Sequence, residues 1–420
     1  MGVLVVLMIV PENFDYDAVT MNGVGAPAAG GPISRALWLA LLVLSLLVLA
    51  GRPALAWLLA RTINPFLLLF VVLALASVAW SIDPALTGRR MVRLITIVTT
   101  CAAFVLTAWH ERRYQAVVRP VLTAMLGGSL VFGLLSPELA IHQETAPELL
   151  NAWRGLANHK NSLGALASFG LILWLHGWLS GQVGTLRALA GLAIGAACMV
   201  LSRSSTALAA CVVVLAFMVC AMRPPAILRR YVPVGVVLLV GAVIVFAMTV
   251  LDLVPGLKSV MSPLVGLTGK DMTFTGRTAI WAIVSEHIRL HPLFGTGYGA
   301  YWVPAPLPGT DSYAFVWHMG AFYPGSAHNG YLEVLNDLGW AGLACLIGYI
   351  LVQARQGVRL IAIEPDQAIL YLALLFQQAL TNVSETHWFA SLSVDFVLTT
   401  LATMALARGL LDAQLREAFG

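Results

Sequence analysis

The stretch SAHNGYLEVLNDLGWAG, residues 326–342, combines a histidine with carboxylates and amides at the edge of an apolar run. Asn329 is a good N-cap for the helix that this run predicts, so His328 lies just outside its first turn. The positive end of a helix disfavours a second proton on an imidazole, so His328 could accept a proton from a substrate. Glu333 and Asp337 share a helix face and need arginines or a polar cavity as partners. Alternatively, His328 only caps the helix or satisfies a buried loop.

A second chemical feature is Arg277, which begins the segment RTAIWAIVSEHIRL. The pattern predicts an amphipathic helix at the membrane surface, with an apolar face made of Ile280, Trp281, Val284 and Ile288. A cation in the first turn opposes the helix dipole. An external anion bound at the same site therefore explains Arg277 better than helix stability does.

The segment WRGLANHKNSLG, residues 153–164, also concentrates polar groups just before an apolar run. On a structural interpretation, Asn161 or Ser162 caps the helix and the bases anchor lipid headgroups. On a functional interpretation, Arg154 and Lys160 form a second cationic wall of the same cavity.

The elements that position these residues lie in a membrane. Of 420 residues, 59% are hydrophobic and only 10% are charged, with a mean hydropathy of +0.86. A soluble protein is excluded because too few polar groups exist to cover its surface.

About eleven apolar runs are long enough to cross a hydrocarbon core as helices, with residues 1–10 as a weak twelfth. They lie near 36–51, 64–81, 91–109, 116–136, 162–180, 185–201, 206–222, 231–253, 330–352, 366–383 and 389–408. Backbone amides must be satisfied within each segment in lipid, and no alternating pattern typical of barrel strands occurs. The expected fold is an all-α polytopic membrane protein with 11–12 transmembrane helices.

The positive-inside rule favours an orientation with the C-terminus in the cytoplasm. It places 13 of the 24 lysines and arginines inside, against 7 in the short outer segments. These seven exceptions are Arg35, Arg89, Arg90, Arg93, Arg154, Lys160 and Arg203. Each alone could be a base that snorkels at a helix end. Several on one face would bind an anion, and the arginine fork suits phosphate.

The expected organisation has four parts. Residues 1–34 form a tail or interfacial segment, 35–253 the first part of the bundle, 254–328 a large outer loop, and 329–420 the last part of the bundle. The outer loops at 137–161 and 254–328 are long, and the larger one is rich in tryptophan and phenylalanine, so we expect them to fold over the bundle.

The sequence predicts no metal, no cofactor and no nucleic-acid partner. Its five cysteines all fall in apolar runs without metal-ligand spacing. The only Asp-x-Asp, at residues 15–17, precedes the first span and is not expected to hold a metal. A net charge of +4 is only weak evidence for anionic lipid or phosphate contact.

His328-Asn329, nine further residues and then Gly339-x-x-Gly342 resemble the signature of the O-antigen ligase and Wzy-type polymerase superfamily. Two further patterns agree: an arginine in GR-x-x-x-W, which is Arg277, and HKN-x-x-G at residues 159–164, which is similar to the exopolysaccharide-polymerase branch. One departure is LSRSSTAL. There Arg203 stands two positions earlier than the family's usual arginine, and Ser205 takes that arginine's place.

The resemblance implies a GT-C-like, metal-independent, inverting glycosyltransferase of the bacterial inner membrane, with a large folded periplasmic loop and an active site that faces the periplasm. The substrates would be an undecaprenyl-pyrophosphate-linked oligosaccharide donor and acceptor. His328 would be the catalytic base, and Arg277 would hold the pyrophosphate. The predicted substrate contacts are Arg154, Lys160, Arg203, Arg90, Asn329 and Glu333.

A polymerase would join lipid-linked repeats into an exopolysaccharide or O-antigen at the periplasmic face, and a chain-length regulator would be a natural partner. A ligase would instead transfer the glycan to lipid A core. A flippase or transporter for the same lipid-linked sugar would explain intramembrane charge as a substrate path. Against that class, the sequence has no evident internal repeat.

Overall fold

The computed structural model shows a helical protein. It describes residues 32–143, 149–157, 159–225, 227, 229–250, 277–303, 311–313, 324–390 and 393–419. Within these ranges all regular elements are helices, and one isolated bridge joins Ile141 to Trp153. The predicted all-α class is confirmed, whereas residues 1–31 of the predicted tail and the Asp-x-Asp lie outside the described part.

The bundle consists of twelve described helices, including the short helix α4 that connects two longer ones. They are α3 (Pro32–Ala50), α4 (Pro53–Thr62), α5 (Pro65–Ala76), α6 (Pro84–Leu106), α7 (Arg113–Leu135), α9 (Lys160–Leu179), α10 (Thr185–Ser202), α11 (Ser205–Met222), α12 (Val232–Val250), α16 (Gly330–Ile361), α17 (Pro365–Thr381) and α18 (Val394–Phe419). The remaining elements are α8 (Pro137–Ala140), α14 (Arg277–Leu290), η1 (Ser77–Ala79), η2 (Arg229–Tyr231) and η3 (Asp311–Tyr313).

Each of the eleven predicted runs overlaps a described helix. Eight of the described helices are long and apolar enough to cross a membrane, or nine if one bent pair forms a single span. The predicted spans at 91–109 and 366–383 correspond to α6 and α17, which are not among the eight. The first turns of α6 carry three arginines, and α17 has only 17 residues.

The bent pair is a feature that the sequence pattern did not reveal. Residues 53–62 form α4, and the next span, from Pro65 to Ala79, meets it at an angle of 99°. Proline opens both helices because its missing N–H is not needed there. Asn64 occupies the corner, where its Oδ1 accepts from Phe66 N and its Nδ2 donates to the Tyr349 carbonyl at 2.8 Å. The corner is thereby fixed to α16.

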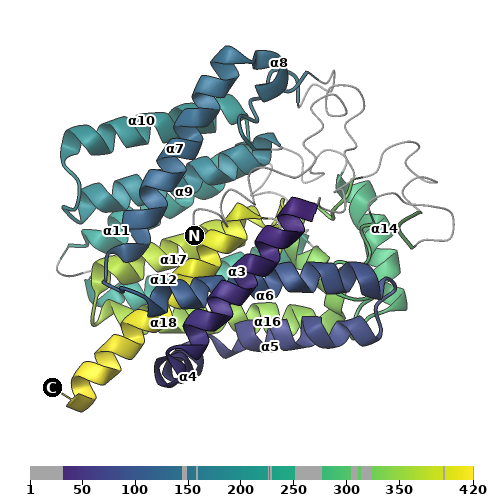
Figure 1. Cartoon of the computed structure of the whole chain (residues 1–420). Coiled ribbons are helices and arrows are strands. Elements are labelled where there is room, and N and C mark those ends of the chain that lie inside the picture. Colours follow the sequence, from purple (N-terminus) through teal and green to yellow (C-terminus); the bar gives the residue numbers. More distant parts are fainter. Residues whose placement is uncertain are drawn as a thin grey trace.

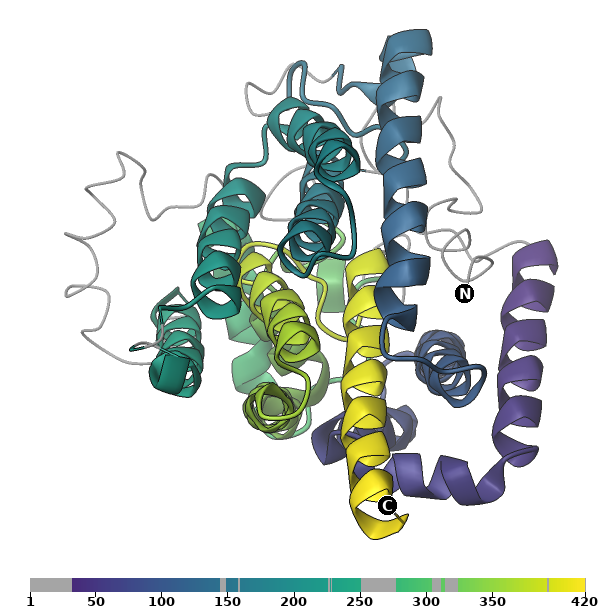
Figure 2. The same cartoon turned by 90° about the vertical axis from the view of Figure 1, so that its left-hand side faces the viewer.

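The short elements mark the two ends of the bundle. In Figure 1, α8 and α14 lie at one end, and α4 lies with the C-terminus at the other. Figure 2 shows α3 at the edge of the bundle, with α4 crossing its foot. The end that carries the first residues of α6, α9 and α16 is called the motif end below. Of the predicted outward bases, Arg35, Arg89, Arg90 and Lys160 lie in the first two turns of α3, α6 and α9, Arg93 lies one turn further along α6, and Arg203 directly follows α10.

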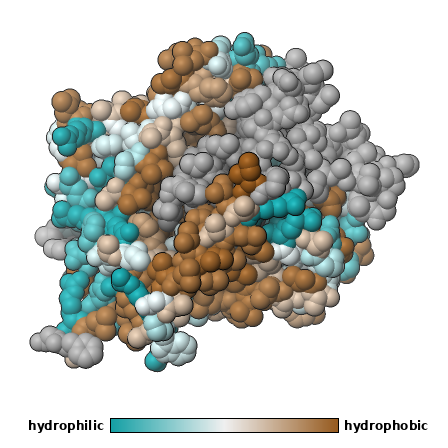
Figure 3. Space-filling model, viewed as in Figure 1, coloured by the Kyte–Doolittle hydropathy of each residue, from teal (hydrophilic) through white to brown (hydrophobic). Residues whose placement is uncertain are grey.

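The surface of the bundle suits a lipid environment. Figure 3 shows a broad apolar area over α3. Several large aliphatic side chains of this helix are exposed, among them Leu39, Val43, Leu44 and Leu47. Exposed apolar area of this size is expected where lipid, rather than water, covers the protein.

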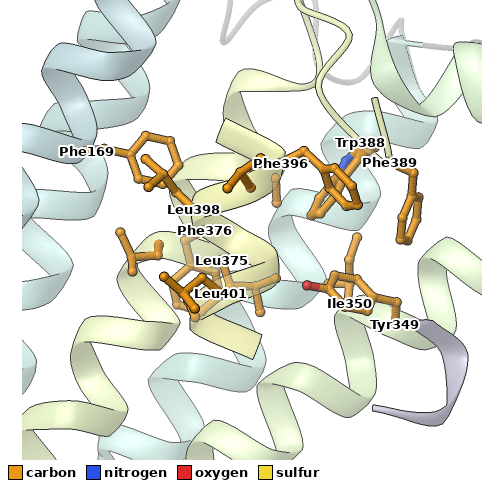
Figure 4. Packing of buried hydrophobic residues seen from close by; sticks show 14 of the residues in the cluster. Phe169, Tyr349, Ile350, Leu375, Phe376, Trp388, Phe389, Phe396, Leu398 and Leu401 are labelled. Atoms are coloured by element: carbon orange, nitrogen blue, oxygen red, sulfur yellow. The ribbon is translucent and has the colours of Figure 1, made fainter. Parts of the chain in front are cut away.

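The buried core ends in aromatic side chains beneath the α17–α18 connection (Figure 4). Phe389 stacks on Phe70 with ring centroids 3.7 Å apart, and Trp388 packs edge-on against Tyr349 at 5.9 Å. These contacts anchor the connection to α5 and α16 through large buried surfaces. The residues that precede Trp388 in this connection are therefore held in place from below.

Gly339, the first glycine of the signature motif, breaks α16. Its φ of 62° and ψ of −160° are not helical, and a Cβ atom there would lie 2.4 Å from the Leu293 carbonyl carbon. Only glycine permits this conformation together with so close an approach. The freed amides beyond the break bond to the irregular segment after α14: Trp340 N donates to the Pro292 carbonyl and Ala341 N to that of Leu293. The glycine thus docks the outer loop onto α16.

Candidate active site

Four segments that are distant in sequence meet around the carboxylate of Glu385 at the motif end. Arg277 Nη2 donates to Glu385 Oε1 at 2.8 Å, and Asn161 Nδ2 donates to the same oxygen at 2.6 Å. His328 Nδ1 lies 3.9 Å from the other oxygen, Oε2. The cluster joins the starts of α9 and α14, the turn before α16 and the α17–α18 connection.

The α17–α18 connection holds Glu385 through a buried asparagine. Asn382 Oδ1 accepts from His387 N at 2.8 Å and from Trp388 N at 2.7 Å, and its carbonyl accepts from Gly330 N. These bonds satisfy amides that cannot reach water. They also tie the connection to the first residue of α16, two positions after His328.

His328 lies in a turn that neighbouring side chains fix on both sides. Its φ of 47° is in the left-handed region, which is uncommon for a residue with a side chain. Ala327 N donates to Glu333 Oε2 at 2.8 Å, and the Ala327 carbonyl accepts from Trp281 Nε1 at 2.9 Å. Asn329 caps α16, as predicted, because its Oδ1 accepts from the amides of Tyr331 and Leu332. A strained backbone conformation persists only where neighbouring contacts hold it, and the hydrogen bonds of Ala327 and Asn329 hold the turn at His328.

Arg277 begins α14, whose predicted amphipathic face is buried at Ile280, Val284 and Ile288. Besides Glu385, the guanidinium bonds to the Ser384 carbonyl. In the structure the anion next to Arg277 is therefore the Glu385 carboxylate, and not only an external ligand, as the sequence suggested. The pair is largely enclosed, since 18% of the Arg277 side chain and 12% of the Glu385 side chain are exposed.

The electrostatics favour an ionised carboxylate at the centre. Burial raises the pKa of the Glu385 carboxyl, but the contact with His328 and the charge of Arg277 outweigh it and lower the pKa to about 2. His159, the residue before α9, responds in the opposite sense: burial dominates and lowers its pKa to about 4. At neutral pH the cluster therefore has one fixed anion, while His159 adds no positive charge.

This arrangement can perform acid–base chemistry. A carboxylate facing Nδ1 orients an imidazole and stabilises the imidazolium, which leaves Nε2 to accept a proton from a hydroxyl. At a separation of 3.9 Å the two groups interact through charge, and a direct hydrogen bond would require them to move closer. Arg277, on the other carboxylate oxygen, brings a fixed positive charge next to the same pair. Sequence reasoning identified His328 and Arg277 but not the carboxylate between them.

Arg90 and the two carboxylates of α16 hold the irregular segment after α14. Arg90 donates to the carbonyls of Gly299 and Trp302. Asp337 Oδ2 accepts from Gly299 N at 2.8 Å. The sequence pattern predicted arginines or a polar cavity as partners of Glu333 and Asp337. In the structure, Glu333 accepts from Ala327 N and Asp337 accepts from Gly299 N, and Arg90 lies near both carboxyl groups.

The remaining predicted contacts also have protein partners. Arg154 is buried and donates through Nε to the Leu139 carbonyl at 2.7 Å. Lys160 begins α9, and its amide donates to His142 Nε2 at 3.2 Å. Arg203 ends α10 in the left-handed conformation and donates to the Leu150 carbonyl. These bonds link the described parts of the 137–161 loop to one another and to the ends of α9 and α10, and none of them joins the Glu385 cluster.

The predicted cap of α9 is wrong. Neither Asn161 nor Ser162 precedes the helix, which begins at Lys160 with His159 as its N-cap. His159 Nδ1 accepts from Asn161 N at 3.3 Å. The Asn161 side chain is thereby free to reach Glu385, so the residue belongs to the polar cluster instead of the cap.

A second buried pair lies beside the cluster and was also missed. His387 Nδ1 contacts Asp395 Oδ2, and both residues are buried. Burial lowers the pKa of His387, but the charge of Asp395 outweighs it, so the pKa of His387 is raised. The only signal for Glu385 and His387 in the sequence was the polar run SETH between two apolar segments.

The fold and the cluster define a multi-pass membrane protein with a histidine, a carboxylate and a guanidinium assembled at one end of its helices. Residues 189–347 match the family model described as O-Antigen ligase. Over 333 residues the chain is 27% identical to the exopolysaccharide production protein ExoQ of Rhizobium meliloti (strain 1021), an alignment that covers 75% of this chain and 71% of that protein.

The two matches confirm the resemblance to the O-antigen ligase and Wzy-type family that the motif predicted. The range matched by the family model includes Arg277, His328 and Gly339, and it ends before Glu385.

Proposed function

We propose that this protein is a glycosyltransferase that polymerises undecaprenyl-pyrophosphate-linked oligosaccharide repeats into an exopolysaccharide. The observation that carries the proposal is the Glu385 carboxylate, which contacts Arg277 and faces His328. The similarity to an exopolysaccharide production protein of Rhizobium supports exopolysaccharide as the product. The protein would work in the bacterial inner membrane, with the motif end towards the periplasm.

The proposed reaction forms one bond and breaks another at the anomeric carbon of the donor. A hydroxyl oxygen of the acceptor attacks this carbon from the face opposite the leaving group, which inverts its configuration. The hydroxyl proton passes to His328 Nε2, while Glu385 stabilises the imidazolium. The bond to the lipid pyrophosphate breaks, and the electron pair leaves with the phosphate. The proton then passes from His328 to solvent.

Arg277 would stabilise the charge that develops on the leaving pyrophosphate. A guanidinium has five N–H donors, and the bonds to Ser384 and Glu385 use two of them. A fixed cation stabilises such charge better than water does because it needs no reorganisation during the reaction. These side chains would suffice for the transfer without a metal. Lys160 and Arg203 stay proposed contacts for the distal phosphate or glycan.

A ligase that transfers the finished glycan to lipid A core is the second candidate, and the description of the matching family model favours it. Both reactions need the same donor and the same base, and they differ in the acceptor.

Product analysis in a deletion strain tests the proposal. For a polymerase, polymer disappears and single lipid-linked repeats accumulate on the periplasmic leaflet. Long polymer that stays on the lipid carrier would indicate a ligase instead. Repeats retained on the cytoplasmic leaflet would indicate a flippase and would overturn the glycosyltransferase proposal.

A further inference from the structure

A second group of polar side chains lies at the other end of α14 from Arg277. His287 and His291 are four residues apart around the C-terminus of this helix, and Asp311 belongs to η3. One ligand atom from each side chain lies within 4.8 Å of the others. None of these residues has a part in the proposed transfer reaction.

His287 has the supporting contacts typical of a metal ligand. Its Nδ1 is 2.9 Å from Oδ1 of Asn336, which is buried in α16. The ring also packs against Tyr301 with centroids 4.3 Å apart. A metal-binding histidine usually donates its second N–H to a protein oxygen, which fixes the ring and its tautomer.

If His287 carries its proton on Nδ1, two hydrogen-bond acceptors, His287 Nε2 and Asp311 Oδ2, face each other. If Nδ1 carries the proton that binds Asn336, the lone pair of His287 Nε2 points at Asp311 Oδ2, 3.0 Å away. Two acceptors at that distance require a proton or a cation between them. His291 lies next to this position as a third donor.

We propose that His287, His291 and Asp311 bind a divalent transition-metal ion such as Zn²⁺. Two imidazoles and one carboxylate form a common ligand set for this ion. Bonds of about 2.1 Å place tetrahedral ligands about 3.4 Å apart. The side chains of His291 and Asp311 are exposed and can rotate by the small amount needed to close the site.

The metal would attach η3 to α14, and through Asn336 to α16. The partial negative charge at the C-terminus of α14 adds a favourable field for a cation. Water would fill the fourth position. The site is a structural clamp on the outer loop, and its existence does not depend on the proposed glycosyltransferase activity.

The test is a zinc titration of the full chain, purified in detergent without a polyhistidine tag and stripped with a chelator. ZnCl₂ is added in competition with a chromophoric chelator. We expect one site per chain, with affinity at least about tenfold weaker in His291→Ala and Asp311→Asn. His110→Ala, at an exposed histidine before α7, is the matched control and should bind as the wild type does.

Weakened binding in at least one ligand variant, with the control unchanged, supports the site. Absence of stoichiometric zinc in the wild type overturns the proposal and leaves a proton between His287 and Asp311. Equal binding by the wild type and both ligand variants overturns it as well. Size-exclusion profiles that match the wild type establish that each variant is folded.

Discussion

Substitution of Glu385 by glutamine isolates the charge at the centre of the proposed site. The amide preserves the shape of the side chain and can still accept from Asn161, but it no longer stabilises an imidazolium on His328. Two unit charges 3.9 Å apart interact by about 4 kcal/mol at an effective dielectric constant of 20. Each 1.36 kcal/mol changes a rate tenfold, so Glu385→Gln should slow transfer by about 10³-fold.

The assay measures the initial rate at which the purified protein extends lipid-linked repeats. Glu286→Gln is the matched control, because Glu286 is exposed on α14 and forms an ion pair with Arg289 on the same helix. Glu385→Asp, which retains the charge, should recover part of the lost rate. A Glu385→Gln protein that is correctly inserted and works within twofold of the wild-type rate would refute the role given to this carboxylate.

Three further predictions concern charge, backbone and pH. Arg277→Ala should lower the transfer rate by about 10²- to 10³-fold in the same assay, with Arg277→Lys in between, because one fixed donor to the leaving group is lost; an unchanged rate removes Arg277 from the site. Gly297 has a φ of 108° and a Cβ there would lie 2.5 Å from Ser81 Oγ, so Gly297→Ala should destabilise the protein by about 1–3 kcal/mol. Gly88→Ala in α6, where a Cβ would meet nothing within 4 Å, should not lower the melting temperature, and equal losses would contradict the reasoning. The pKa of Glu385 falls from 4.5 to about 2, so its ionisation adds about 3 kcal/mol of stability above pH 4.5 that disappears as the pH falls towards 2. The melting temperature should therefore drop more steeply over this range in the wild type than in Glu385→Gln; parallel curves would contradict the lowered pKa.

Much of the fold followed from local patterns. Apolar length identified every long helix, and the amphipathic pattern identified α14, because these signals lie within single segments. The corner between α4 and α5 was missed, since α4 has only ten residues, too few for a span, and lies in the short connection between two predicted spans. Its direction depends on contacts with α16 that no local pattern encodes.

The site divides in the same way. His328 belongs to a signature motif, and Arg277 lies at the start of a predicted helix. Sequence reasoning therefore found both. Glu385 comes from a short connection more than fifty residues further along the chain, and tertiary packing alone brings it to them. On the structural interpretation of its segment, Asn161 or Ser162 caps the helix, but α9 begins at Lys160 with His159 as its N-cap.

The role of His328 as proton acceptor is the central claim, and the rate of His328→Ala tests it most directly. The variant is purified with His110→Ala as the control, and both are given a defined lipid-linked repeat. We predict that His328→Ala forms polymer at least about 10²-fold more slowly, while the control matches the wild type. Polymer formation at the wild-type rate by a folded His328→Ala protein would contradict the account.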